Sequence, residues 1–283
     1  MIYLPIIGAL ALASITILER TVLRKRKIST RFFLSAAFLS SVIVMLPLLY
    51  FFWDVSPGAF QLKNILIFLI IITLSIFANL SVFYAFKWEK VSKLEPALIM
   101  EPLFVVLLAF VFSFFFAGLY ERDPQIIIPA IIAGVALIYS NIKKHHLSIN
   151  KYFLAAILGS FLYASELIVT RLILDYYTPI SFYFIRCSAI FLLSLLIFKP
   201  HMTKLSSRVK WEIFIIGALW VVFRVIVYYG YLALGVVFTT LLIMLGPVFV
   251  YLFARIFLKE KLEMRNIIAA IVIVACVLYV VLF

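Results

Sequence analysis

The sequence has little charge for its length and few of the residues that build disulfide-linked folds. Charged residues make up 13% of the 283 residues, and two cysteines are too few for a disulfide framework. Cys187 and Cys276 fall within apolar runs and are interpreted as small packing residues. The apolar runs contain no HExxH motif, no paired aspartates on one helix and no serine–histidine constellation. We therefore predict no catalytic residues, no metal site and no cofactor.

Apolar residues dominate instead, at 67% of the chain with a mean hydropathy of +1.23, which excludes a soluble domain of this size. A helix that spans a bilayer needs about 20 mostly apolar residues, and long runs of this kind recur without the alternation of barrel strands. The sequence predicts an all-α integral membrane protein of ten transmembrane helices. The expected spans are residues 3–23, 31–53, 64–86, 94–116, 125–142, 152–174, 180–198, 211–233, 238–258 and 266–283.

The basic residues gather in alternate connections between these spans. They are Arg20, Arg24, Lys25, Arg26, Lys27, Arg31, Lys87, Lys90, Lys93, Lys143, Lys144, Lys151, Lys199, Lys204, Arg208, Lys210, Lys259, Lys261 and Arg265. The other connections contain only Lys63 and Arg122. Positively charged loops face the cytoplasm, so the chain is expected in the cell membrane with both termini extracytoplasmic. Topology therefore explains the net charge of +13 better than binding to nucleic acid or anionic lipid, and no nucleic-acid partner is predicted.

Two stretches of the chain resemble each other. A constant offset aligns Val82 with Val227 and Pro102 with Pro247, and a slightly different offset aligns the first span with the sixth. We interpret the chain as two five-helix repeats, residues 1–142 and 152–283, joined by a basic linker at 143–151. Because five is odd, the second repeat enters the membrane in the opposite direction. Inverted repeats place a substrate site near the bilayer midplane, between the halves.

Several motifs resemble those of EamA-type transporters of the drug/metabolite transporter superfamily. They are YYGYLALG, a proline inside the following span, FYFIRCSAIFLL, and LKEKLEMRNIIAAIVIVACVLYV with Glu260 in its loop. Glu121 in YERDPQ resembles the counterpart of Glu260 in the first repeat. The resemblance covers essentially the whole chain. It implies ten helices, a central cavity and secondary transport of small metabolites, often outward, without naming a substrate.

Charged residues inside the spans are the first candidate site residues. A charge at the bilayer centre costs about 2.5–3.5 kcal/mol, so such residues face protein or water and have partners. Glu166, Arg186 and Arg224 reach a similar depth on three helices, and Glu101 lies closer to the cytoplasmic side. We expect Glu166 and Arg186 to interact, either as a structural bridge or as part of proton coupling. Glu19, near the end of the first span, is expected to snorkel toward the cytoplasmic boundary.

Arg224 is the candidate for substrate selection. Its guanidinium suits a carboxylate or phosphate, with Trp220 and Tyr228 as an aromatic wall on either side. Asn79 is its equivalent in the first repeat, and Tyr163 lies one turn before Glu166. The alternatives are a strut between Arg224 and Glu101, and a packing role for Tyr163.

Pro102 and the Gly246–Pro247 pair are equivalent between the repeats and predict helix kinks or gating hinges. The predicted function is a secondary transporter that moves a small metabolite or drug-like solute by alternating access. Its partners are that solute, the bilayer and, in one version, protons taken up by Glu166 or Glu101. The alternative is a membrane scaffold or an intramembrane enzyme, and a cavity between the repeats would favour transport.

Overall fold

The computed structural model describes residues 4–25, 28–89, 91–116, 118–141, 150–199, 205–246, 248 and 264–282. These residues form an all-helical bundle, and their one extended pairing is an isolated bridge between Val55 and Tyr177. The first half contains α1 (Leu4–Leu23), α2 (Thr30–Phe52), η1 (Pro57–Phe60), α3 (Leu62–Trp88), α4 (Val91–Leu98), α5 (Met100–Ser113) and α6 (Pro124–Asn141). The second contains α7 (Lys151–Arg171), η2 (Leu174–Tyr176), α8 (Pro179–Phe198), α9 (Ser207–Ala233), α10 (Val236–Ile243) and α12 (Met264–Leu282).

The helices match the expected spans closely. Among the described residues, seven helices are long and apolar enough to cross a membrane, and the shorter apolar stretch Pro124–Ser140 adds to them. The fourth expected span is divided at Ile99 into α4 and α5. Only the first part of the ninth is described, as α10, so Pro247 and Glu260 lie outside the described residues. The protein is thus a multi-pass membrane protein.

Local sequence signals set several helix starts. The side chain of Ser29 accepts a hydrogen bond from Phe32 N at the start of α2, and Asn150 accepts from Tyr152 N and Phe153 N at the start of α7. Thr178 caps α8, where Pro179 occupies the first helical position. Each cap satisfies backbone N–H groups that have no partner inside the helix.

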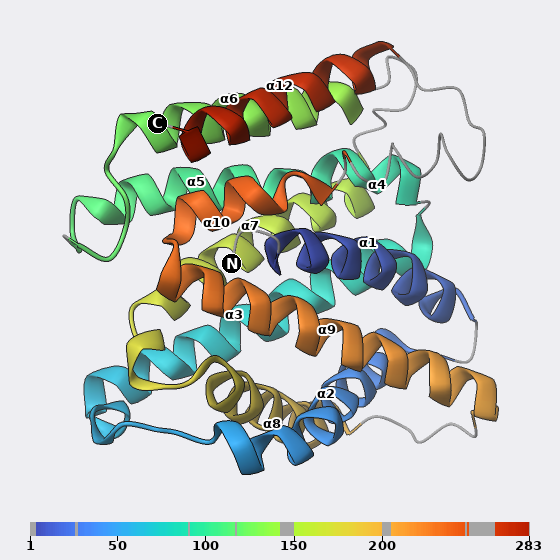
Figure 1. Ribbon diagram of the computed structural model, residues 1–283. Coiled ribbons are helices and arrows are strands. Elements are labelled where there is room, and N and C mark those ends of the chain that lie inside the picture. The colour runs from blue at the N-terminus through green and yellow to red at the C-terminus, as the bar shows by residue number, and fades with distance from the viewer. Residues whose placement is uncertain are drawn as a thin grey trace.

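Helices of the two halves pair across the bundle. The α2–α8 pair forms one side and the α6–α12 pair the other, with α3 against α7 and α1 against α9 between them (Figure 1). Large apolar side chains such as Leu66, Leu158 and Leu196 are exposed on the outer surface, where lipid would cover them.

Small residues allow the paired helices to approach closely. A Cβ atom added at Gly217 on α9 would lie 2.8 Å from Ser41 N and 2.9 Å from Ser40 C of α2. These are backbone atoms and cannot move aside without shifting the helix. By contrast, a Cβ atom at Gly134 on α6 would meet only the flexible side chain of Leu103 at 3.1 Å and more distant atoms. The α2–α9 contact therefore depends on glycine.

We expect Gly217→Ala to lower the free energy of unfolding by about 1–3 kcal/mol, the usual cost of overpacking. Thermal unfolding of the purified protein in detergent measures this, with Gly134→Ala as the matched control. Equal unfolding temperatures for the two variants would contradict the close approach of α2 and α9.

Candidate functional site

Three buried charges meet at the centre of the bundle. Glu166 on α7 is 0% exposed, and Arg186 on α8 and Arg224 on α9 are each 1% exposed. One carboxylate oxygen, Oε2 of Glu166, lies 3.3 Å from Nη2 of Arg186 and 3.3 Å from Nη1 of Arg224. The predicted interaction of Glu166 with Arg186 is confirmed. Arg224 also pairs with Glu166, so the alternative strut between Arg224 and Glu101 is replaced by this three-residue cluster.

Arg186 is the more completely bound of the two arginines. Its Nε and Nη2 donate to Ser75 Oγ on α3, at 3.0 and 2.8 Å, and its Nη1 donates to Tyr228 Oη at 2.8 Å. The other carboxylate oxygen of Glu166 accepts from Thr170 Oγ1 at 3.1 Å and from Tyr228 Oη at 3.5 Å. Side chains from four helices thus bind one another in a connected network, which suits a structural role for Arg186 and Tyr228.

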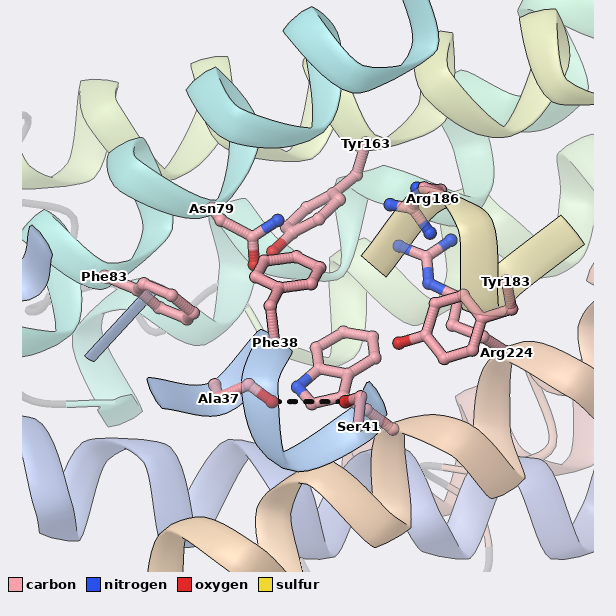
Figure 2. Close-up of a pocket in the computed structure, with 10 residues that line it drawn as sticks. Ala37, Phe38, Ser41, Asn79, Phe83, Tyr163, Tyr183, Arg186 and Arg224 are labelled. Atoms are coloured by element: carbon pink, nitrogen blue, oxygen red, sulfur yellow. Dashed lines mark hydrogen bonds between the residues drawn. The ribbon is translucent and has the colours of Figure 1, made fainter. Parts of the chain in front are cut away.

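Arg224 is held mainly by aromatic rings. Its guanidinium lies 5.3 Å from the Trp220 ring centroid, 5.5 Å from Tyr163 and 5.8 Å from Phe223. Figure 2 shows the guanidinium groups of Arg186 and Arg224 close together at one side of a small pocket, which Asn79, Phe38 and Tyr183 also line. The pocket has a volume of about 20 Å³, enough for about one water molecule.

A second and larger cavity lies between the two halves of the chain. Its volume is about 270 Å³, close to the lower end of the roughly 300–1,000 Å³ typical of small-molecule sites. The cavity is lined by residues of eight helices: α1, α3, α4, α5, α6, α7, α9 and α10. The contribution of α6 is Leu137. The acidic lining residues of the cavity are Glu19, Glu95 and Glu101, and no lysine, arginine or histidine is among the described residues that line it. Phe86, Tyr163, Trp220, Phe223 and Tyr231 supply the aromatic lining.

The sequence-predicted residues are divided between the two spaces. Tyr163 and Trp220 line both and separate them. Arg224, Arg186 and Asn79 line the small pocket, whereas Glu101, Pro102 and Gly246 line the large cavity. Tyr228 lines neither, because it is fully buried against Arg186 rather than forming a wall beside Arg224.

Glu19 is the main residue that sequence reasoning misplaced. It does not snorkel: it is 2% exposed and accepts a hydrogen bond from Trp220 Nε1 at 2.8 Å. The physical reason is that this indole N–H, 201 positions away, offers the carboxylate a partner inside the bundle. Glu95 was also missed, although both glutamates stand in or beside apolar runs, which is a usable signal.

The lining of the large cavity comes within two turns of both ends of the bundle. Glu19, Phe86 and Leu137 lie in the last two turns of α1, α3 and α6, at one end. Tyr231 lies in the last turn of α9, at the opposite end, although none of the lining residues belongs to the loops at 53–61, 114–123 or 172–178 there.

Backbone pairing closes that opposite end. Ser56 N donates to Tyr176 O at 2.9 Å and Thr178 N donates to Asp54 O at 3.2 Å, on either side of the Val55–Tyr177 bridge. The hydroxyl of Thr178 donates to Phe52 O at 2.6 Å. We call residues 54–56 and 176–178 the clasp. It joins the loop after α2 to the segment before α8, and so connects the two halves.

Glu121 makes a second connection at the clasp end. Its carboxylate accepts from Val237 N at 2.9 Å and Phe238 N at 3.3 Å in the first turn of α10. Gly235 has a φ of +87°, and a Cβ atom there would lie 2.1 Å from the carboxylate, so glycine permits both the turn and the contact. Burial raises the pKa of the Glu121 carboxyl, although the backbone N–H groups of α10 oppose this. The connection therefore loses its charge at a higher pH than an exposed glutamate would.

We expect Glu166→Gln alone to lower the free energy of unfolding by about 3–5 kcal/mol, because it leaves two buried guanidiniums facing each other. Adding Arg186→Met should recover part of this loss, since one positive charge is then removed. Thermal unfolding in detergent compares the two single variants with the double variant. A double variant as unstable as the sum of the singles would show that the residues do not act as a pair.

Comparisons with known proteins agree with this architecture. A solved crystal structure, described only as that of a protein, superposes with a TM-score of 0.70 and 16% identity. The match covers 99% of this chain and 96% of the other, and it shows a shared fold. A search of curated proteins finds no match. Residues 150–282 match the family model of the EamA-like transporter family. The second half of this multi-pass membrane protein is thus similar to the EamA-like transporters of the drug/metabolite transporter superfamily.

Proposed function

We propose that the protein is a secondary transporter that moves a small metabolite or drug-like solute across the membrane by alternating access. The large cavity between the halves carries this proposal, because a scaffold would have no need to keep a space of about 270 Å³ open among eight helices. The family match over residues 150–282 supports it. An intramembrane enzyme has less support, since no nucleophile is paired with a base among the described residues that line the cavity.

Two inverted five-helix repeats are the proposed basis of the movement. In such an arrangement, contacts between elements should come in equivalent pairs. The packing of α3 on α7 and of α1 on α9 is one such pair, and α2–α8 and α6–α12 each join equivalent helices. These contacts support a twofold relation between residues 1–142 and 152–283, with residues 143–151 as the linker. Alternating access then amounts to rocking of one half against the other.

The positions of cavity and clasp support one particular state. If the basic loops face the cytoplasm, the clasp and the Glu121 connection close the outer end, and we expect the cavity to open toward the cytoplasmic end. This is the state from which an exporter would load its solute. The helix division at Ile99, followed by Pro102, and Gly246 on the cavity wall supply the proposed hinges.

Proton coupling is assigned to Glu101 rather than to Glu166. Glu166 is held by two arginines, and protonation would leave both charges without their partner. The carboxylate of Glu101 faces the cavity and forms no ion pair with any residue that the structure describes. A proton can therefore bind and leave Glu101 without breaking the central cluster.

Transport is tested by counterflow in proteoliposomes loaded with one unlabelled solute, with its radiolabelled form outside. Phenylalanine, uridine, glucose and benzyltrimethylammonium are tested in turn. We expect the protein to concentrate at least one tracer transiently. Leu98→Trp, which places an indole in the cavity, should abolish this, whereas Leu107→Trp on the outer surface of α5 should not.

Counterflow of none of these solutes, or full activity in Leu98→Trp, would argue for the scaffold. Binding of a solute without exchange would do the same.

The proposed orientation is tested by labelling intact cells with a membrane-impermeant thiol reagent. In a background with Cys187→Ala and Cys276→Ala, Gln61→Cys near η1 should react and Ser29→Cys before α2 should not. Permeabilised cells, in which both should react, are the control. Reaction of Ser29→Cys alone in intact cells would reverse the orientation and, with it, the assignment of the open end to the cytoplasm.

A further inference from the structure

The large cavity has the chemistry of a site for a positively charged solute, an inference that rests on the transport function proposed above. Glu19 and Glu101 line it from the first half of the chain, on α1 and α5, and none of its described lining residues is basic. A carboxylate in a membrane interior is costly unless a proton or a cation neutralises it. An anion in the same space would face two carboxylates.

The carboxylate of Glu101 in the cavity wall has no direct protein partner. It forms no hydrogen bond or ion pair with any residue that the structure describes, although Arg224 attracts it electrostatically. Tyr163 is 5% exposed and its ring lies on the partition between the two spaces, with its hydroxyl beside Asn79 in the small pocket (Figure 2). The carboxylate of Glu101 is therefore available to a ligand in the large cavity.

The remaining walls suit the body of an organic cation. Trp220, Phe223 and Tyr231 line the cavity from one face of α9, and Phe86 lines it from α3. Aromatic faces attract ammonium groups, and Trp is the most favourable of them. Leu12, Val105 and Ile243 add apolar surface, so the site favours an organic cation over a hydrated metal ion.

Arg186 and Arg224 do not place a positive charge in the lining of the large cavity. Arg224 lies on the far side of the Tyr163–Trp220 partition, in the small pocket, and its charge is shared with Glu166. Its guanidinium occupies the ring faces of Trp220 and Tyr163 as a cation would. The same two residues thus contact a protein cation on one side and the cavity on the other.

We propose that the cavity binds a monovalent organic cation, with its ammonium group between Glu101 and Glu19. Its apolar body would lie against Tyr163, Trp220 and Phe223. This assigns substrate selection to the carboxylates of the first half, and leaves Arg224 to hold the partition in place. The sequence predicts that Arg224 selects an anionic solute, whereas this proposal has Glu101 and Glu19 select a cation.

The test is isothermal titration of the purified full-length protein with three solutes of similar size. They are benzyltrimethylammonium, the neutral N,N-dimethylbenzamide and the anion phenylacetate. We expect the cation to bind at least about tenfold more tightly than the other two, since one ion pair or cation–π contact corresponds to roughly this factor.

Glu101→Gln should weaken binding of benzyltrimethylammonium by about tenfold or more, because the charge is lost while the shape is kept. Glu101→Asp should retain most of the affinity, and Trp220→Leu should lose it in part. Glu212→Gln is the matched control, because Glu212 pairs with Lys25 and Arg208 away from the cavity. Size-exclusion profiles and unfolding temperatures establish that each variant is folded.

Three results would overturn the inference: no binding of the cation, unchanged cation binding in Glu101→Gln, or tighter binding of phenylacetate that depends on Arg224. Failure of the transport function is seen separately. If the protein binds the cation through Glu101 but shows no counterflow, the cation site is supported and the transport function is contradicted. A protein that exchanges only neutral or anionic solutes keeps the function and loses the cation site.

Discussion

The carboxylate of Glu166, shared between Arg186 and Arg224, is the interaction on which the rest of the bundle depends. No member could remain in the membrane interior alone, so the three must meet, and α7, α8 and α9 are fixed relative to one another. Ser75 extends the cluster to α3 through Arg186. The packing of the second half, and its contact with the first, follow from satisfying one negative and two positive charges.

The cluster carries one more positive charge than negative, and the aromatic partition determines where that excess acts. Tyr163 and Trp220 lie over the Arg224 guanidinium and separate it from the large cavity. On one side of these rings lies the small pocket of about 20 Å³, which both arginines line. On the other side lies the large cavity of about 270 Å³, which glutamates line. A single layer of rings thus divides a structural charge cluster from a space open to solutes, each with its own sign.

Much of this follows from the sequence, and the part that does not has a clear cause. Apolar runs locate the helices because a bilayer demands about 20 such residues, and the depth of Glu166 and Arg186 along those runs is enough to predict that they meet. Glu19 was misplaced because depth alone cannot tell a snorkelling glutamate from one bonded inward. Its partner Trp220 belongs to the other half of the chain, and the pairing of Arg224 likewise depends on how α7 and α9 pack.

The clasp end and the centre of the bundle differ in the kind of interaction that joins their helices. The clasp consists of backbone hydrogen bonds between the halves, and Glu121 adds a carboxylate that holds the start of α10. When water reaches that end, hydrogen bonds to water can replace these bonds. Each therefore contributes only about 1 kcal/mol to the stability of the closed end. The buried charges at the centre cannot exchange in this way without a large cost. A conformational cycle that breaks the clasp while keeping the Glu166 cluster intact is therefore the least costly route to opening the cavity on the other side.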